Sequence, residues 1–230
     1  MSPRREERDR PLRRPPGPDR RRRVLHLFVE GEVTEATYAD RINAHFGQQQ
    51  RFHLKVHEHS TGGGKPRDLV DAATRLRTEE LPRARDRRDP EREPEVWCLF
   101  DRDDHGEVDT AVAEALRNGV RVAFSHPCFE LWLLLHFQPF ATPLSGRCGD
   151  LTSKLRQHHG FKCFDKRVGE VEWAALGGRF DRARMQALQL VAQCPTGGCG
   201  PEDHVSHCVP TNRDPSTDVW KLLDSLRLRY

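Results

Sequence analysis

Long apolar runs are absent from this sequence of 230 residues. The longest, Phe129 to Phe137, covers nine residues and is interrupted by Glu130 and His136. It falls well short of the ~18 apolar residues that a membrane span requires. The Arg-rich start of the chain has no apolar stretch behind it, so it does not have the pattern of a secretory signal. We therefore expect no membrane attachment and a cytoplasmic location.

The sequence contains seven cysteines, which is an odd number. Without an export signal, a framework of disulfides is not expected. Cys98 and Cys128 stand in apolar runs, which is typical of buried free thiols. Cys128 also follows Pro127 at the expected start of a helix, where a thiol can become nucleophilic, but we favour core packing for it.

The net charge of +3 conceals an asymmetry between the two parts of the chain. Residues 1–23 hold ten Arg and four acidic residues, a balance of +6, which leaves −3 for the rest. With five prolines and few apolar residues, this segment cannot bury enough surface to order itself, so we expect a disordered basic tail. It could attract phosphates without sequence preference, or it could be a solvated extension with no function.

After the tail, short apolar or alternating segments alternate with amphipathic ones. Strands are predicted at 24–30, 51–58, 95–100 and 120–124, and helices at 35–46, 66–78, 107–118 and 128–137, with Thr34 as the cap of the first. This order indicates βαβ units and an α/β fold with a mainly parallel sheet flanked by helices. Beyond residue 150 only helical patterns occur, near 150–158, 170–177, 179–193 and 216–228. We therefore predict an α/β domain at 24–140 and a helical C-terminal extension at 141–230, packed on the same domain.

Acidic residues follow two of the predicted strands. Glu30 ends the first, and Asp101 ends the third, with Asp103 and Asp104 in the turn behind it. The carboxyl ends of parallel strands are where α/β proteins place their sites, and clustered carboxylates suit Mg²⁺ or Mn²⁺. For Asp101 and Asp103 taken alone, a structural role in a turn or as a helix cap is as well supported as a role in a metal site.

Glu130 lies in the first turn of a helix that is otherwise apolar on almost every face. A carboxylate buried there is costly unless it is paired or bound to a metal, so we favour a site residue over a helix-dipole effect. Glu35 also lies in a first helical turn, where stabilisation of the dipole is the commoner role, and it remains a secondary candidate.

Four segments together resemble the RloB family. They run in order over nearly the whole chain beyond the tail: Glu30-Gly31 with Thr34-Glu35 and Tyr38; Phe100 to Asp104; Ser125 to Trp132 with His136-Phe137; and Asp214 to Thr217. Asp214 stands where the family usually has Asn, and we interpret it as a helix cap, since both residues cap well.

The resemblance implies a TOPRIM-like core, which is the Glu plus Asp-x-Asp fold of topoisomerases, primases and related nucleases. It implies that Glu30 is a general base or metal-linked acid and that Asp101 and Asp103 hold Mg²⁺, with Asp104 nearby. Nucleases of this kind also need a positive group near the phosphate, for which Lys162 or Lys166 is nominated. The predicted catalytic set is Glu30, Asp101, Asp103, Glu130 and Lys166.

The family is linked to restriction loci and abortive infection, often beside an AAA-type or ABC-type ATPase. We therefore expect a metal-dependent nuclease acting on DNA or on RNA such as tRNA, in antiphage defence. The main alternative is a non-catalytic partner module that regulates an ATPase, and a third is nucleotidyl transfer at the same metal site. Association into a homo-oligomer is left open.

Two other motifs are weak. The segment from Ser60 to Pro66 has His59 and Pro66 where a phosphate-binding P-loop needs Gly and Ser or Thr, so it fails that pattern. Cys194, Cys199, His207 and Cys208, with His204 nearby, only partly fit the ligand spacing of structural zinc. For these we favour a chance grouping of Cys and His in a loop over a zinc site.

Overall fold

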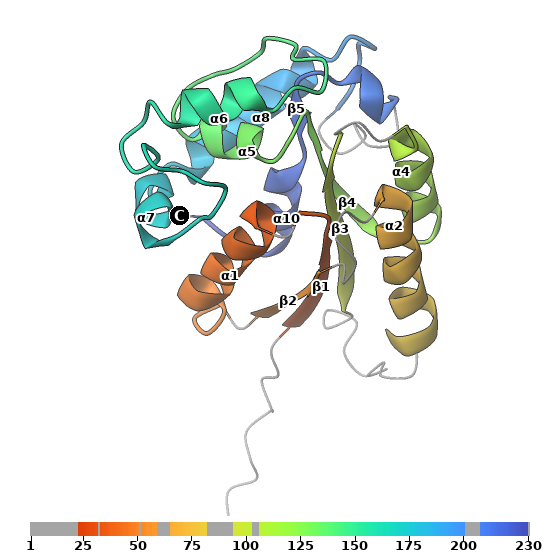
Figure 1. Cartoon of the computed structure of the whole chain (residues 1–230). Helices are drawn as coiled ribbons and strands as arrows, with labels where there is room; N and C mark the ends of the chain where they lie inside the picture. Colours follow the sequence, from red (N-terminus) through yellow and green to blue (C-terminus); the bar gives the residue numbers. More distant parts are fainter. Residues whose placement is uncertain are drawn as a thin grey trace, which may run out of the picture.

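The computed structural model describes residues 23–31, 33–50, 52–58, 65–81, 94–102, 106–200 and 208–229. These residues form a three-layer α/β fold, in which a five-stranded sheet has helices against both faces (Figure 1). The strand order is β2-β1-β3-β4-β5. The predicted α/β class and mainly parallel sheet are confirmed.

Four strands of the sheet are parallel: β1 (Arg23–Val29), β2 (Phe52–Glu58), β3 (Glu95–Asp101) and β4 (Arg121–His126). Most residues of β1 and β3 are buried because helices cover both faces, which explains their continuous apolar sequences. The fifth strand, β5 (Ser216–Thr217), runs antiparallel to β4. The expectation of helices alone after residue 150 is therefore wrong at this point, where a two-residue strand is too short to show any periodicity.

One face of the sheet is covered by α2 (Pro66–Arg75), which continues as the π-helical turn η1 (Leu76–Glu80), and by α4 (Val108–Arg117). The apolar side of α2 packs with α4 and the sheet in one core cluster. Gly119 ends α4 with a φ of +69°, and a β-carbon there would lie 2.9 Å from Arg77 Nε. The left-handed backbone therefore favours glycine at this position.

The other face carries the remaining helices: α1 (Thr34–Phe46), α5 (Glu130–Leu135), α6 (Gly149–Leu155), α7 (Glu170–Leu176), α8 (Phe180–Ala192) and α10 (Val219–Ser225). A 3₁₀ turn, η3 (Pro210–Asn212), precedes β5. All six residues of α5 are buried because α6 and α8 cover it (Figure 1). The C-terminal helices therefore share one core with α1 and the sheet. None of the described helices combines the length and the apolar character that crossing a bilayer requires.

Strand β1 begins at Arg23, one residue inside the segment predicted to be a disordered tail. The Arg23 guanidinium donates to Glu95 Oε1 at 2.6 Å and to the Ser225 carbonyl at 2.6 Å. Arg23 therefore belongs to the folded domain, and residues 1–22 lie outside the described residues.

Candidate metal-binding carboxylate site

Glu30 and Asp101 meet at the carboxyl ends of β1 and β3, which are neighbouring interior strands. The backbone N–H of Glu30 donates to the Leu99 carbonyl at 3.1 Å, which extends the β1–β3 ladder by one residue. The backbone N–H of Asp101 donates to Glu30 Oε2 at 3.2 Å. The side chain of Glu30 therefore lies across the end of β3, where parallel α/β sheets place their sites.

Asp101 is a buried carboxylate of which one oxygen is bonded and the other is not. Oδ2 accepts a hydrogen bond from the backbone N–H of Phe129 at 3.0 Å, just before α5. Oδ1 is buried and has no hydrogen-bond partner among the described residues. Burial raises the pKa of Asp101 well above its ordinary value, and the charges of Glu35 and Glu130 raise it further.

Glu130 is the first residue of α5 and is only 3% exposed. Thr34 Oγ1 donates to Glu130 Oε1 at 3.4 Å, so the hydroxyl joins α1 to α5. The prediction that Thr34 caps α1 is wrong: Val33 occupies the N-cap position and Thr34 is the first helical residue. The Thr34 hydroxyl donates to a carboxylate from a distant part of the chain, which sequence spacing could not indicate.

The helix predicted at 128–137 is shorter in the structure, where it begins at Glu130 and ends at Leu135.

Glu35, which was only a secondary candidate in the sequence analysis, is a fourth acidic residue of this group. Its carboxyl lies against Gly31, where a β-carbon would be 2.0 Å from Glu35 Oε2. Its pKa is raised to about 7, first by burial and then by the charges of Glu130 and Glu30. The only signal in the sequence was its place in the Glu30-Gly31…Thr34-Glu35 segment, since burial depends on residues far away in the chain. We call Glu30, Glu35, Asp101 and Glu130 the carboxylate cluster.

Lys166 brings positive charge to this cluster. It lies in the loop between α6 and α7 with a φ of +76°, and its charge lowers the pKa of Glu35 against the stronger causes that raise it. Lys162 and Arg167 are exposed on the same loop. Of the two lysines nominated from the sequence, Lys166 is the one whose charge reaches Glu35.

The donor type of the carboxylate cluster suits a hard divalent cation, although among the described residues three ligand atoms gather within 4.8 Å of one another only at Cys194, Cys199 and Cys208. Carboxylate oxygens are the ligands of Mg²⁺ and Mn²⁺, and a cation would offset the repulsion that raises these pKa values. The unbonded Asp101 Oδ1 adds an oxygen that is costly to bury without a partner. Asp103 and Asp104, predicted to join this site, lie outside the described residues.

Cys128 is a buried thiol with no character of a nucleophile. A hydrogen bond with Cys148 and burial both raise its pKa far above the ordinary value, which keeps it protonated. The sequence interpretation as a core residue agrees with this environment.

Asp214 does not cap a helix, because α10 begins at Val219 with Asp218 as its N-cap. Instead, Asp214 Oδ2 accepts hydrogen bonds from the backbone N–H groups of Leu144 at 2.9 Å and Ser145 at 2.6 Å. The cap interpretation is therefore wrong, and the carboxylate anchors the loop that follows α5.

The cysteines of the weak zinc motif gather at a different place. Cys194, Cys199 and Cys208 have their sulfur atoms within 4.8 Å of one another. His204 and His207 lie outside the described residues.

These observations define an α/β protein with a carboxylate cluster at the carboxyl edge of its parallel sheet. A model of the RloB-like protein family matches residues 25–226, and the chain belongs to this family. The match runs from within β1 to the end of α10 and includes every residue of the carboxylate cluster. Comparison with curated proteins gives no significant match, and neither does comparison with solved structures.

Proposed function

We propose that this protein is a metal-dependent nuclease that hydrolyses phosphodiester bonds of DNA or RNA. The observation that carries the proposal is a group of four carboxylates, from the end of β1, from α1, from β3 and from α5, whose charges act on one another. Two of them, Glu35 and Asp101, have raised pKa values. Perturbed carboxylates gathered at the functional edge of an α/β sheet are a common mark of a catalytic site.

Glu30 and Asp101 are the proposed metal ligands. They lie together at two strand ends, and Asp103 and Asp104 follow Asp101 closely in the sequence. Bound Mg²⁺ or Mn²⁺ would lower the pKa of a water molecule and neutralise charge on the leaving oxygen. The N–H of Phe129 holds one oxygen of Asp101, which orients the other toward a ligand.

Glu35 is the proposed general base. A carboxyl with a pKa of about 7 can accept a proton from an attacking water near neutral pH, whereas an ordinary carboxylate is a weaker base. The family resemblance implied that Glu30 is either a general base or a metal-linked acid. With Glu35 as the base, Glu30 takes the metal-linked role. Glu130 helps to keep the pKa of Glu35 raised through its charge.

The loop that carries Lys162, Lys166 and Arg167 is the proposed contact for the nucleic-acid backbone. Exposed cations beside an acidic site attract phosphates and offset the repulsion between a polyanion and the carboxylate cluster. The charge of Lys166 lowers the pKa of Glu35, which supports a role for this loop near the carboxylate cluster.

The proposed setting is antiphage defence together with an AAA-type or ABC-type ATPase. Support comes from the link of the RloB family to restriction loci and abortive infection.

A second candidate is a non-catalytic partner module of such an ATPase. It is favoured by the hydrogen bonds that the same carboxylates make within the fold. Asp101 binds the N–H of Phe129, and Glu130 binds Thr34, so both tie α5 to other elements. Carboxylates with purely structural roles would need no metal.

The test incubates the purified full chain with plasmid, single-stranded DNA and tRNA, in Mg²⁺, Mn²⁺ or EDTA, with and without a candidate partner ATPase of the AAA or ABC type. We expect cleavage that requires the cation and is lost in Glu35→Gln. The control is Asp181→Asn, because Asp181 has an 84% exposed side chain on α8. Cleavage that persists in EDTA would contradict the metal dependence, and no cleavage of any substrate with the ATPase present would favour the partner module.

A further inference from the structure

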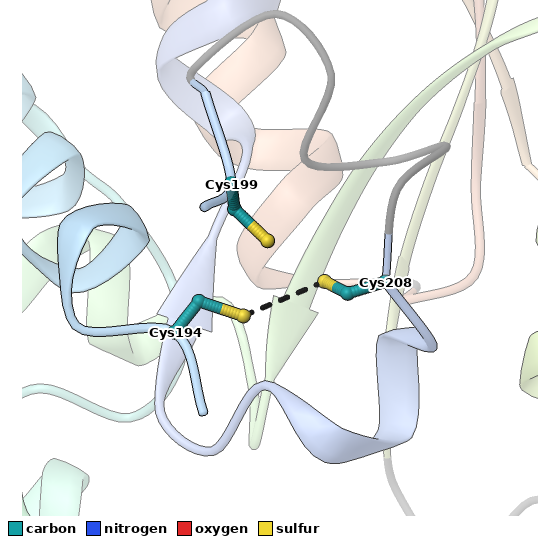
Figure 2. A group of neighbouring side chains, drawn as sticks. All are labelled: Cys194, Cys199 and Cys208. Atoms are coloured by element: carbon teal, nitrogen blue, oxygen red, sulfur yellow. Dashed lines mark hydrogen bonds between the residues drawn. The ribbon is translucent and has the colours of Figure 1, made fainter. Parts of the chain in front are cut away.

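Three cysteine sulfur atoms converge at the C-terminal end of α8, outside the carboxylate cluster. Cys194 follows α8, Cys199 follows a glycine turn, and Cys208 precedes η3, and all three side chains point toward a common centre (Figure 2). Their sulfur atoms all lie within 4.8 Å of one another, and those of Cys194 and Cys208 are 3.5 Å apart. Cys194 and Cys208 are buried, and Cys199 is half-buried.

The backbone between Cys194 and Cys199 is shaped to return the second thiol to the first. The N–H of Gly197 donates to the Cys194 carbonyl at 2.9 Å, which closes a tight turn. Gly197 and Gly198 then have φ values of +69° and +66°, in the left-handed region that favours glycine. Two consecutive left-handed residues reverse the chain and direct Cys199 toward Cys194.

The distances fit a metal better than a disulfide. Zn–S bonds of ~2.3 Å in a tetrahedron separate two sulfur atoms by about 3.8 Å. The separation of Cys194 and Cys208 is close to that value, whereas a disulfide requires about 2.05 Å.

Hydrogen-bond donors and a buried positive charge surround these sulfur atoms. The backbone N–H of Thr196 bonds to the Cys194 thiol, and Arg213 Nε donates to Cys208 Sγ at 3.0 Å. Arg213 is only 2% exposed, and its guanidinium also pairs with Asp218 at 3.4 Å. Three thiolates and Zn²⁺ carry a net charge of −1, which a buried guanidinium complements. Donors of this kind orient and stabilise sulfur ligands of a metal.

We propose that Cys194, Cys199 and Cys208 bind one structural Zn²⁺ through their thiolates. Binding releases one proton from each thiol. Three thiolates leave one of the four tetrahedral positions to another donor. The ion ties the end of α8 to the segment that leads into β5, and so holds this edge strand against β4.

The test measures metal in the full chain, purified under reducing conditions without chelator. Elemental analysis is expected to give about one zinc per chain, and cobalt substitution should give a thiolate-to-cobalt charge-transfer band. Cys199→Ser should lose most of the zinc and the band, and this side chain is the least buried of the three. The control Cys163→Ser, at an exposed cysteine, should keep both.

Asp101→Asn should also keep the zinc and the band, which separates the cysteine site from metal held by the carboxylate cluster. Wild-type protein that folds with no zinc and shows no charge-transfer band on cobalt addition would overturn the proposal. Recovery of a Cys194–Cys208 disulfide peptide from freshly purified protein would overturn it as well.

Discussion

The carboxyl group of Glu35 occupies the space in which a β-carbon of residue 31 would lie. A β-carbon built on Gly31 would be 2.0 Å from Oε2 and 2.6 Å from Oε1 of Glu35. Atoms cannot approach so closely, so a side chain at residue 31 would displace the buried Glu35 carboxyl from this position. This relationship joins the end of β1 to the first turn of α1, and it gives a physical reason for glycine directly after Glu30.

Gly31→Ala is expected to displace the Glu35 carboxyl and to lower the free energy of unfolding by about 1–3 kcal/mol. Urea denaturation measures the change. Gly149→Ala is the matched control, because a β-carbon at Gly149 meets nothing within 4 Å, and it should be neutral or slightly stabilising. In a Glu35→Ala background, Gly31→Ala should cause little further loss in the free energy of unfolding. Equal costs in both backgrounds would show that the clash is not the cause.

Glu35→Gln is expected to change how the stability of the metal-free protein depends on pH. Because the folded-state pKa is raised from 4.5 to about 7, the contribution of Glu35 is complete below pH 4.5 and is lost as pH rises through 7. In EDTA, the variant should therefore match wild type at pH 4.5 and exceed it at pH 8, by up to about 3 kcal/mol. Urea denaturation at both pH values gives the comparison, with Asp181→Asn as the control. Parallel pH dependence of wild type and Glu35→Gln would contradict the burial of a charged carboxylate.

Asp101→Asn is expected to separate catalysis from folding. Asn keeps an oxygen to accept the Phe129 N–H, and it removes a charge that Glu35 and Glu130 oppose. The stability of the metal-free protein should stay the same or rise slightly. Mg²⁺-dependent cleavage should fall by about 100-fold or more, since loss of an outer-shell partner alone costs 10–100-fold. A fully active and phage-protective Asp101→Asn protein would remove the nuclease proposal and leave the partner module.

Deletion of residues 1–22 is expected to leave the free energy of unfolding within about 0.5 kcal/mol of wild type. Affinity for nucleic acid should fall modestly, with a shallower dependence on salt, because the segment is basic and the rest of the chain has a net negative charge. Chemical denaturation and salt titrations of binding check both effects. Adding Arg23→Ala to the truncated chain should reduce stability, since Arg23 binds Glu95 and Ser225. A large loss of stability on deletion of 1–22 alone would show that the segment packs on the domain.

Much of the fold could be predicted from local pattern. The apolar runs at β1 and β3 predicted strands buried on both faces, and their alternation with amphipathic segments predicted the parallel sheet. Parallel strands that share a sheet bring their carboxyl ends to one edge, so Glu30 and Asp101 could be expected to meet there. Glu130 could be predicted as a site residue for a different reason, because a single acidic residue in an otherwise apolar helix is costly to bury.

The rest depended on contacts between distant parts of the chain. The raised pKa of Glu35 arises from burial and from the charges of Glu130 and Glu30, and neither can be read from its own surroundings in the sequence. Thr34 looked like a helix cap because local spacing allows that bond, yet the folded chain offers it Glu130 instead. Strand β5 is stabilised by pairing with β4 and not by its own composition. Cys194 and Cys208 are fourteen residues apart, and only the folded chain brings their sulfur atoms together. Local sequence pattern was enough to predict the order of the elements up to α5 and the acidic residues at the strand ends, whereas tertiary packing sets burial, the proximity of charges and the partners of each polar group.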